Sequence, residues 1–157
     1  MINYVNGNIL DGIEKIIVQS VNHQGVMGAG LAKQIATKYP EILNDDRMYK
    51  EMCRDFSFES IKRQGLVAWH NTGDGKFIAS VFGQDRYGRG GRLTDYVSLG
   101  NGLETVRELA SDKNYSVSIP FGIGCGLGGG NWEVVLGIIT DCFKYSTEVN
   151  VFIYNLK

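Results

Sequence analysis

Glycine is concentrated between Pro120 and Trp132, where the chain reads PFGIGCGLGGGNW, and six of the nine residues from Gly122 to Gly130 are glycine. Glycine weakens the interior of a strand, so this composition predicts a loop whose backbone takes positive φ angles or lets a ligand approach its amides closely. An apolar strand pattern precedes the loop and an apolar helical pattern follows it. The loop would therefore direct backbone N–H groups and a helix N-terminus at one spot, an arrangement that binds phosphate.

Two further glycine-containing loops carry polar side chains. The first spans 22–30 and reads NHQGVMGAG, and the second spans 83–92 and reads GQDRYGRGGR. The amides of Asn22 and Gln84 suit sugar hydroxyls, while glycine loops at helix N-termini suit a diphosphate. One such loop could be an ordinary turn between a strand and a helix, but three together predict a shared ligand site. No Walker motif is present, and the GxGxxG match at 124–129 lacks the acidic residue about 20 positions later that a dinucleotide-binding motif has.

Few titratable side chains lie in or beside these loops. His23, with an unperturbed pKa of about 6.5, suits general acid or base chemistry, although it could equally be a hydrogen-bonded loop residue. Asp85 and Asp95 are carboxylates that could activate a water, and Asp95 could instead cap a helix that begins around residue 94. Cys125 has no accompanying His–Asp pattern, which favours a small packing residue over a nucleophile.

The elements that would position these loops follow from the hydrophobic pattern. Short apolar, β-branched runs predict strands, and helical patterns between them predict a layered α/β sheet, in which ligands bind beyond the carboxyl ends of the strands. If the strands before the three loops are parallel neighbours, the loops share one crevice. Asn131 is a candidate N-cap for the last helix. The predicted strands are 2–5, 16–21, 66–69, 76–82, 116–120 and 149–154, and the predicted helices lie around 31–36, 94–111 and 134–142, with a helix and a surface loop over 41–65.

Composition limits the classes of function. The chain has 157 residues and a formal net charge of −1, which predicts one domain over 1–157 and argues against non-specific binding to nucleic acid. The N-terminus lacks the layout of a signal peptide and no apolar run approaches membrane-spanning length, so we expect a cytoplasmic protein without a membrane partner. Three cysteines without C-x-x-C spacing and only two histidines predict reduced thiols, no protein-ligated metal and no resident cofactor.

Five segments occur in an order that one known family shares. They are VNGNIL at 5–10, VQSVN at 18–22, GVMGAGLA at 25–32, IPFGIGCGL at 119–127 followed by Trp132 and Glu133, and VFIY at 151–154. On these motifs, which run over nearly the whole chain, the protein resembles the macrodomain family. Within it, the protein looks similar to the branch with the terminal ADP-ribose protein glycohydrolase and the yeast-type ADP-ribose-1″-phosphate phosphatase. The resemblance implies a single macrodomain, a three-layer α/β/α sandwich with a mixed central sheet of about six strands. The segment 82–89 is similar to one that is typical of bacterial and phage members.

The family binds ADP-ribose, and the resemblance implies a role for each matching residue. Asn22 would hold the distal ribose, and the two glycine loops would wrap the diphosphate. Tyr154 matches an aromatic that packs on the adenine in several members, but it could also be an ordinary core residue. Asn8 stands where many members have an aspartate that accepts from the adenine amino group; an Asn carbonyl can accept the same bond, although Asn8 could instead serve only in the turn after Gly7. The implied ligand-binding residues are Asn8, Ile9, Asn22, Gly28, Ala29, Gly30, Gln84, Ile123, Gly124, Cys125, Gly126, Leu127 and Tyr154.

The resemblance does not extend to the catalytic groups of these two relatives. Where the glycohydrolase has a catalytic lysine and aspartate, this chain has Gln84 and Gly128, which can neither form a Schiff base nor carry a charge. The position of the phosphatase histidine is occupied by Gln19. Neither known mechanism is therefore carried over to this chain.

Two classes of function remain open at this point. The first is a hydrolase of an ADP-ribose derivative, such as the 1″-phosphate or an O-linked ester, with His23 or Asp85 as the general base. The second is a module that captures ADP-ribose, ADP-ribosylated protein or an NAD-derived signal without turnover, as a phage-encoded inhibitor of host signalling would. A third and less favoured hypothesis is that Arg86, Arg89 and Arg92 dock the end of a nucleic acid.

Overall fold

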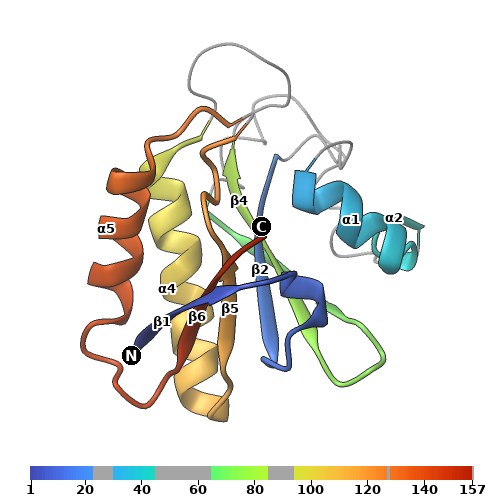
Figure 1. Cartoon of the computed structure of the whole chain (residues 1–157), viewed down its shortest axis with the longest axis horizontal. Helices are drawn as coiled ribbons and strands as arrows, with labels where there is room; N and C mark the ends of the chain where they lie inside the picture. Colours follow the sequence, from blue (N-terminus) through green and yellow to red (C-terminus); the bar gives the residue numbers. More distant parts are fainter. Residues whose placement is uncertain (23–29, 45–64, 85–93, 127, 157) are drawn as a thin grey trace.

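A six-stranded sheet forms the central layer of the described part of this computed structural model (Figure 1). The structure describes residues 1–22, 30–44, 65–84, 94–126 and 128–156. All neighbouring strands are parallel except β3, which is antiparallel to β4, so the predicted mixed sheet is confirmed. The strands lie in the order β1 (Ile2–Asn6), β6 (Val151–Asn155), β5 (Val117–Pro120), β2 (Ile16–Asn22), β4 (Phe77–Gln84) and β3 (Val67–Asn71).

Helices cover both faces of this sheet (Figure 1). On one face lie α4 (Tyr96–Lys113) and α5 (Trp132–Phe143). On the other face lie α1 (Gly30–Lys38), the short α2 (Glu41–Asn44) and a 3-10 turn, η1 (Ile9–Asp11). Each face has its own apolar cluster, which confirms the three-layer architecture.

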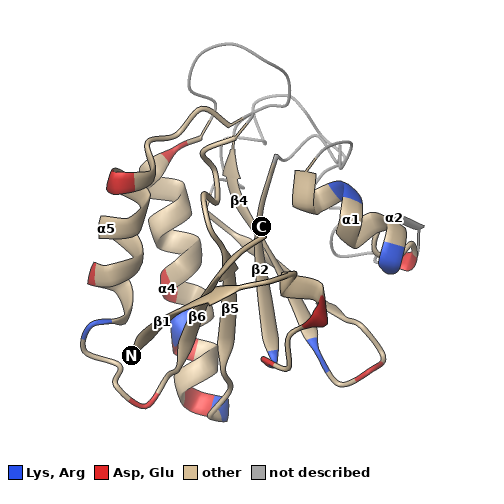
Figure 2. Cartoon of the chain, in the orientation of Figure 1, with Lys and Arg blue, Asp and Glu red and all other residues tan. Residues whose placement is uncertain are grey.

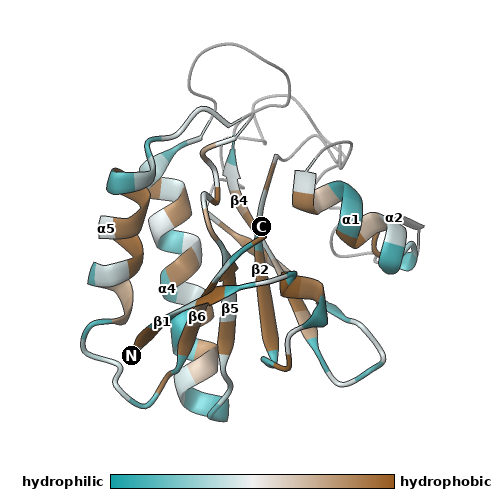
Figure 3. Cartoon of the chain, viewed as in Figure 1, coloured by the Kyte–Doolittle hydropathy of each residue, from teal (hydrophilic) through white to brown (hydrophobic). Residues whose placement is uncertain are grey.

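The central strand β2 contributes to both clusters because its side chains alternate between the two faces. Val18 belongs to the cluster beneath α4 and α5, whereas Ile17 belongs to the cluster beneath α1. Figure 3 shows the resulting concentration of hydrophobic residues along the strands. The strand is therefore buried on both faces, as its run of apolar, β-branched residues predicts.

Side-chain caps fix where the two long helices begin. Asp95 accepts hydrogen bonds from the amides of Val97 and Ser98, at 3.1 and 3.2 Å, and caps α4. Asn131 accepts from the amide of Glu133 at 2.8 Å and caps α5, which confirms its prediction as an N-cap. Of the two roles that the sequence left open for Asp95, the structure shows the capping role.

Gly102 explains why α4 carries a glycine that lowers its helix propensity. A Cβ at this position would lie 2.2 Å from Cγ1 of Val81, so the helix backbone packs directly on β4. This close approach places the N-terminus of α4 beside the carboxyl end of β4. The glycine is therefore a packing requirement, and its cost in helix propensity is offset by contact with the sheet.

The strands β5, β2 and β4 are adjacent and parallel, so their carboxyl ends meet at one edge of the sheet. Each leads into a helix: β2 into α1, β4 into α4, and β5 into α5. The connection after β5 is described except for residue 127, whereas most of the other two connections, 23–29 and 85–93, lies outside the described residues. The predicted convergence of three strand ends is confirmed.

Candidate functional site

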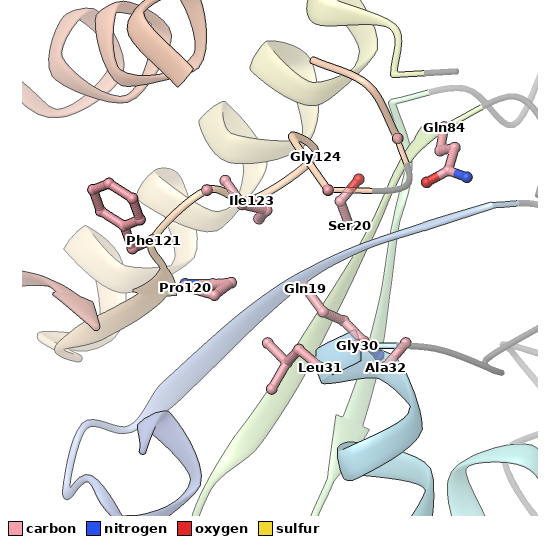
Figure 4. Close-up of a pocket in the computed structure, with 13 residues that line it drawn as sticks. Gln19, Ser20, Gly30, Leu31, Ala32, Gln84, Pro120, Phe121, Ile123 and Gly124 are labelled. Atoms are coloured by element: carbon pink, nitrogen blue, oxygen red, sulfur yellow. The ribbon is translucent and has the colours of Figure 1, made fainter. Parts of the chain in front are cut away.

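A cleft of about 260 Å³ lies at the carboxyl ends of β2, β4 and β5 (Figure 4). Its lining comes from Gln19 and Ser20 of β2, Gln84 at the end of β4, residues 30–32 at the start of α1, and residues 120–124, 126 and 128 of the glycine loop. These are parts of the three segments that the sequence predicts to share one crevice. Parallel α/β sheets bind their ligands at this edge.

The glycine loop has the backbone conformation that its composition predicts. Gly122, Gly124 and Gly129 have φ angles of +78°, +73° and +72°. Residues with a Cβ rarely adopt this left-handed region, so glycine is required at these three positions. Gly30, where α1 begins at the opposite wall of the cleft, also has a positive φ of +58°.

Alternate amides of this loop are free to bind an anion. Within the loop, the amides of Ile123, Cys125 and Gly129 close tight turns by donating to carbonyls three residues earlier, at 3.1, 2.8 and 3.1 Å. Four glycine amides of the loop donate to no acceptor in the described part of the chain, and their residues line the cleft. Backbone N–H groups that face one concavity can bind an anion, so these amides are candidates for such a site. The residues with free amides are Gly122, Gly124, Gly126 and Gly128.

Two polar side chains on the floor of the cleft have unused hydrogen-bonding capacity. Gln19 is 1% exposed; its Nε2 donates to Oγ of Ser80 at 2.8 Å, and its Oε1 has no partner among the described residues. The buried Oγ of Ser20, from the next position of β2, likewise has none. Buried polar atoms are nearly always satisfied, so these two atoms are candidates for hydrogen bonds to a ligand.

The cleft has no ionisable side chain among its described lining residues. Figure 2 shows that the charged residues of the described part lie mainly on the helices and on the loops at the other end of the sheet. An anion in this part of the cleft would therefore be attracted by backbone dipoles and by the positive N-terminal end of α1, whose first residues line the cleft.

Gly128 has no room for a side chain. A Cβ built there would lie 2.5 Å from Oγ1 of Thr94 and 2.7 Å from the carbonyl oxygen of Gly124. This is the position where, by the resemblance, the glycohydrolase has its catalytic aspartate. The packing of the loop thus excludes a carboxylate from this position.

Cys125 lies half-buried within the glycine loop, and burial raises the pKa of its thiol. Its Sγ–H donates to the carbonyl of Ile123 at 3.4 Å. A raised pKa keeps the thiol protonated at neutral pH, and a protonated thiol is a poor nucleophile. The geometry agrees with the packing role predicted from the sequence.

Tyr154, near the end of β6, is linked to the glycine loop through its backbone. It pairs with Pro120 of β5, and its carbonyl accepts from the amide of Phe121 at 2.7 Å. Its ring packs against the apolar cluster beneath α1. Burial, together with the neighbouring carboxyl group of Glu14, raises the pKa of its phenol to about 12. A Cβ at Gly12 would lie 2.5 Å from this hydroxyl, so the ring sits directly under η1.

Asn8 and Ile9 lie at the start of η1, after β1. The Oδ1 of Asn8 accepts from the amide of Leu10 at 3.0 Å and caps the turn, which is the structural role that the sequence offered as an alternative. Ile9 is buried in the same apolar cluster as the ring of Tyr154. Neither residue is part of the cleft's described lining.

Some of the remaining predicted site residues lie in the described part of the chain, and others lie outside it. Asn22 is the last residue of β2 and pairs with Gln84 of β4, so both residues lie at the same edge of the sheet. Five predicted residues lie outside the described part of the chain, and their contribution to the cleft stays a prediction. They are His23, Gly28, Ala29, Asp85 and Leu127.

Sequence patterns did not identify Ser20 as a residue that lines the cleft, or Thr94 as a residue that packs against the glycine loop. Ser20 lies inside an apolar strand, and Thr94 directly precedes the cap of α4. A single serine or threonine carries no motif, and its role becomes visible only once the sheet brings distant segments together. The sequence singles out Gln19 only through the resemblance, because it occupies the position of the phosphatase histidine.

Known proteins resemble the whole chain in sequence and in fold. No protein-family model matches it. It is 26% identical to the ADP-ribose 1″-phosphate phosphatase of Candida glabrata, over 99% of this chain and 98% of that protein. It is 28% identical to the DNA ADP-ribosyl glycohydrolase of Mycobacterium tuberculosis, over 98% of this chain but only 42% of that protein. The chain thus spans less than half of the glycohydrolase.

A solved structure, the macrodomain of Mycobacterium tuberculosis DarG, superposes on this fold with a TM-score of 0.80. The two are 28% identical, and the match covers 98% of this chain and 97% of that one. The similarity therefore includes the sheet, both helical layers and the edge at which the cleft lies.

Proposed function

We propose that this chain, which is a macrodomain, binds ADP-ribose or an ADP-ribose derivative in the cleft at the carboxyl ends of β2, β4 and β5. The observation that supports this most strongly is the row of four free glycine amides lining the cleft. Such a row suits the two linked phosphates of a diphosphate better than a single carboxylate. The names of both sequence relatives refer to ADP-ribose, which agrees with this chemistry.

In this proposal the diphosphate lies on the glycine loop and each end of the ligand extends along the sheet edge. The distal ribose lies toward the end of β2 and Gly30, where Gln19 and Ser20 offer unused hydrogen-bonding groups. The adenine lies toward η1 and Tyr154, whose backbone is joined to the start of the loop. The free Oε1 of Gln19 could accept a hydrogen bond from a ribose hydroxyl. The side-chain carbonyl of Asn8 could accept one from the adenine amino group.

Hydrolysis of an ADP-ribose derivative is the second candidate function, because both sequence relatives carry the names of hydrolases. The substrate would be ADP-ribose 1″-phosphate or ADP-ribose joined through an ester to a macromolecule such as a protein. The described lining offers no general base, so His23 or Asp85 would have to serve. A cleft that holds the distal ribose in a reactive orientation could still assist attack by a water on the bond to be hydrolysed.

Calorimetric titration with ADP-ribose tests binding, and AMP and ribose 5-phosphate serve as controls that each lack part of the ligand. We expect saturable binding of ADP-ribose that is at least tenfold tighter than binding of either fragment, because only the whole ligand spans the loop (a tenfold ratio is about 1.4 kcal/mol). Absence of heat with ADP-ribose at millimolar concentration would overturn the proposal.

Incubation with ADP-ribose 1″-phosphate and with ADP-ribosylated protein, followed by product analysis, separates the hydrolase from a module that only captures its ligand. Tight binding without product would reject the hydrolase. If product forms, His23→Ala and Asp85→Ala should each be assayed, since loss of turnover with retained ADP-ribose affinity identifies the base. Unchanged rates in both variants would show that neither residue has this role.

A further inference from the structure

Thr94 lies where the end of β4, the start of α4 and the glycine loop meet. It is 2% exposed, and its backbone forms an isolated bridge with Gln84. The amide of the next residue, Asp95, donates to the carbonyl of Gly83 at 2.8 Å. The position of Thr94 is thus set by the sheet and by the first turn of α4, independently of the loop that it touches.

From this fixed position Thr94 holds the glycine loop at two points. Its Oγ1 donates to the carbonyl of Gly124 at 2.7 Å, and its backbone amide donates to the carbonyl of Gly128 at 2.9 Å. The same carbonyl of Gly124 also accepts from the amide of Gly130 at 2.9 Å. Hydrogen bonds therefore join the first half of the loop, at Gly124, to its second half, at Gly130, and join both halves to Thr94.

The fit between Thr94 and the loop requires glycine on the loop side. A Cβ at Gly124 would lie 3.1 Å from Oγ1 of Thr94, and a Cβ at Gly128 only 2.5 Å from it. The threonine hydroxyl fills the space that side chains at these two positions would need. Both glycines belong to the set whose free amides line the cleft.

We propose that Thr94 is a positioning residue that presets the anion-binding amides of the glycine loop and so strengthens binding of the ligand's diphosphate. This inference rests on the proposed function. Thr94 does not touch the ligand; it acts through Gly124 and Gly128. A loop held in its binding geometry before the ligand arrives loses less conformational entropy on binding, and the affinity is correspondingly higher.

The test compares three variants in calorimetric titrations with ADP-ribose. Thr94→Val keeps the shape but removes the hydroxyl donor, and Thr94→Ser restores the donor. Thr105→Val is the matched control, because the Thr105 hydroxyl donates to the carbonyl of Asn101 within the same helix, at 3.3 Å, outside the cleft. We expect about tenfold weaker binding for Thr94→Val, as for the loss of one hydrogen bond that organises the site, and at most about a twofold change for the other two.

Amide hydrogen exchange without ligand provides a second readout, which a general loss of stability would not reproduce. In Thr94→Val the amides of Cys125 and Gly130, which close the loop, should exchange about tenfold faster. The amide of Val135, which donates to Asn131 at the start of α5, should be unchanged.

Each outcome decides a different point. If the wild type binds ADP-ribose and Thr94→Val binds equally well, the inference is overturned and the proposed function stands. Faster exchange throughout α4 and α5 would show a general structural role and would also overturn it. If the wild type does not bind ADP-ribose, the proposed function fails together with the ligand role of Thr94, and the exchange rates still report whether the hydroxyl holds the loop.

Discussion

At the scale of single residues, packing within the glycine loop decides which side chains the loop can carry. Gly128 stands where a resembling glycohydrolase has an acid, and the space for its Cβ is taken by Thr94 and by the carbonyl of Gly124. The glycine richness of the loop predicted positive φ angles, and three of the glycines have them. The crowding at Gly128 could not be predicted, because it depends on a threonine 34 positions earlier in the sequence.

Gly128→Ala should weaken ADP-ribose binding by at least tenfold and lower the free energy of unfolding by about 1–3 kcal/mol, since the new methyl group overpacks the loop. Gly137→Ala is the matched control, because Gly137 lies in α5 with open space around it. There the same change should raise the free energy of unfolding by about 0.5–1 kcal/mol, through improved helix propensity, without affecting binding. Urea unfolding and calorimetry measure both effects; equal stability of Gly128→Ala and the wild type would contradict the observed crowding.

Tyr154 should make stability depend on pH in the alkaline range. Its phenol has a pKa of about 12 in the folded protein, raised by burial and by the neighbouring carboxyl group of Glu14, against about 10 in an unfolded chain. A raised pKa means that folding favours the neutral phenol, so the contribution is complete below about pH 10 and is lost as the pH rises toward 12.

Chemical unfolding of the wild type and Tyr154→Phe at several pH values between 9 and about 12 measures this contribution. The wild type should lose stability relative to Tyr154→Phe as the pH rises, because the variant has no phenol to ionise. A difference that stays constant over this range would show that the phenol is not held in its neutral form.

At the scale of elements, hydrophobic periodicity was sufficient to predict every strand of the described sheet to within two residues at either end. The pattern suggests a helix from around residue 94, and α4 starts at Tyr96, directly after its cap Asp95. The sequence predicted both strand-to-helix order and the convergence of the loops, but the contacts between the loops are tertiary and leave no local signal.

Substitutions of Asp95 distinguish its capping role from a catalytic one. Asp95→Ala should lower the free energy of unfolding by about 1 kcal/mol, and Asp95→Asn should leave it nearly unchanged, since asparagine caps helices as well as aspartate does. Any turnover should survive Asp95→Asn, because the carboxylate is already engaged with the amides of Val97 and Ser98. Loss of turnover in a stable Asp95→Asn variant would contradict this assignment.

At the scale of the whole molecule, the sheet brings together segments that are far apart in the sequence, and they line one cleft at its edge. The described lining of that cleft is uncharged, so in the proposed function the attraction for a diphosphate would come from backbone amides. None of the helices in the described ranges has the length and apolar character needed to cross a membrane. That the chain functions as one domain over 1–157 stays a prediction.

The measurement that tests the central claim most directly is a titration of the isotopically labelled protein with ADP-ribose, followed through its backbone amide resonances. We predict saturable shifts concentrated on the free amides of Gly122, Gly124, Gly126 and Gly128, because hydrogen bonds to phosphate oxygens change the environment of these protons most. The amides of Cys125 and Gly129 already donate within the loop and should shift less. Absence of shifts at millimolar ADP-ribose, or shifts confined to residues away from the loop, would contradict the account.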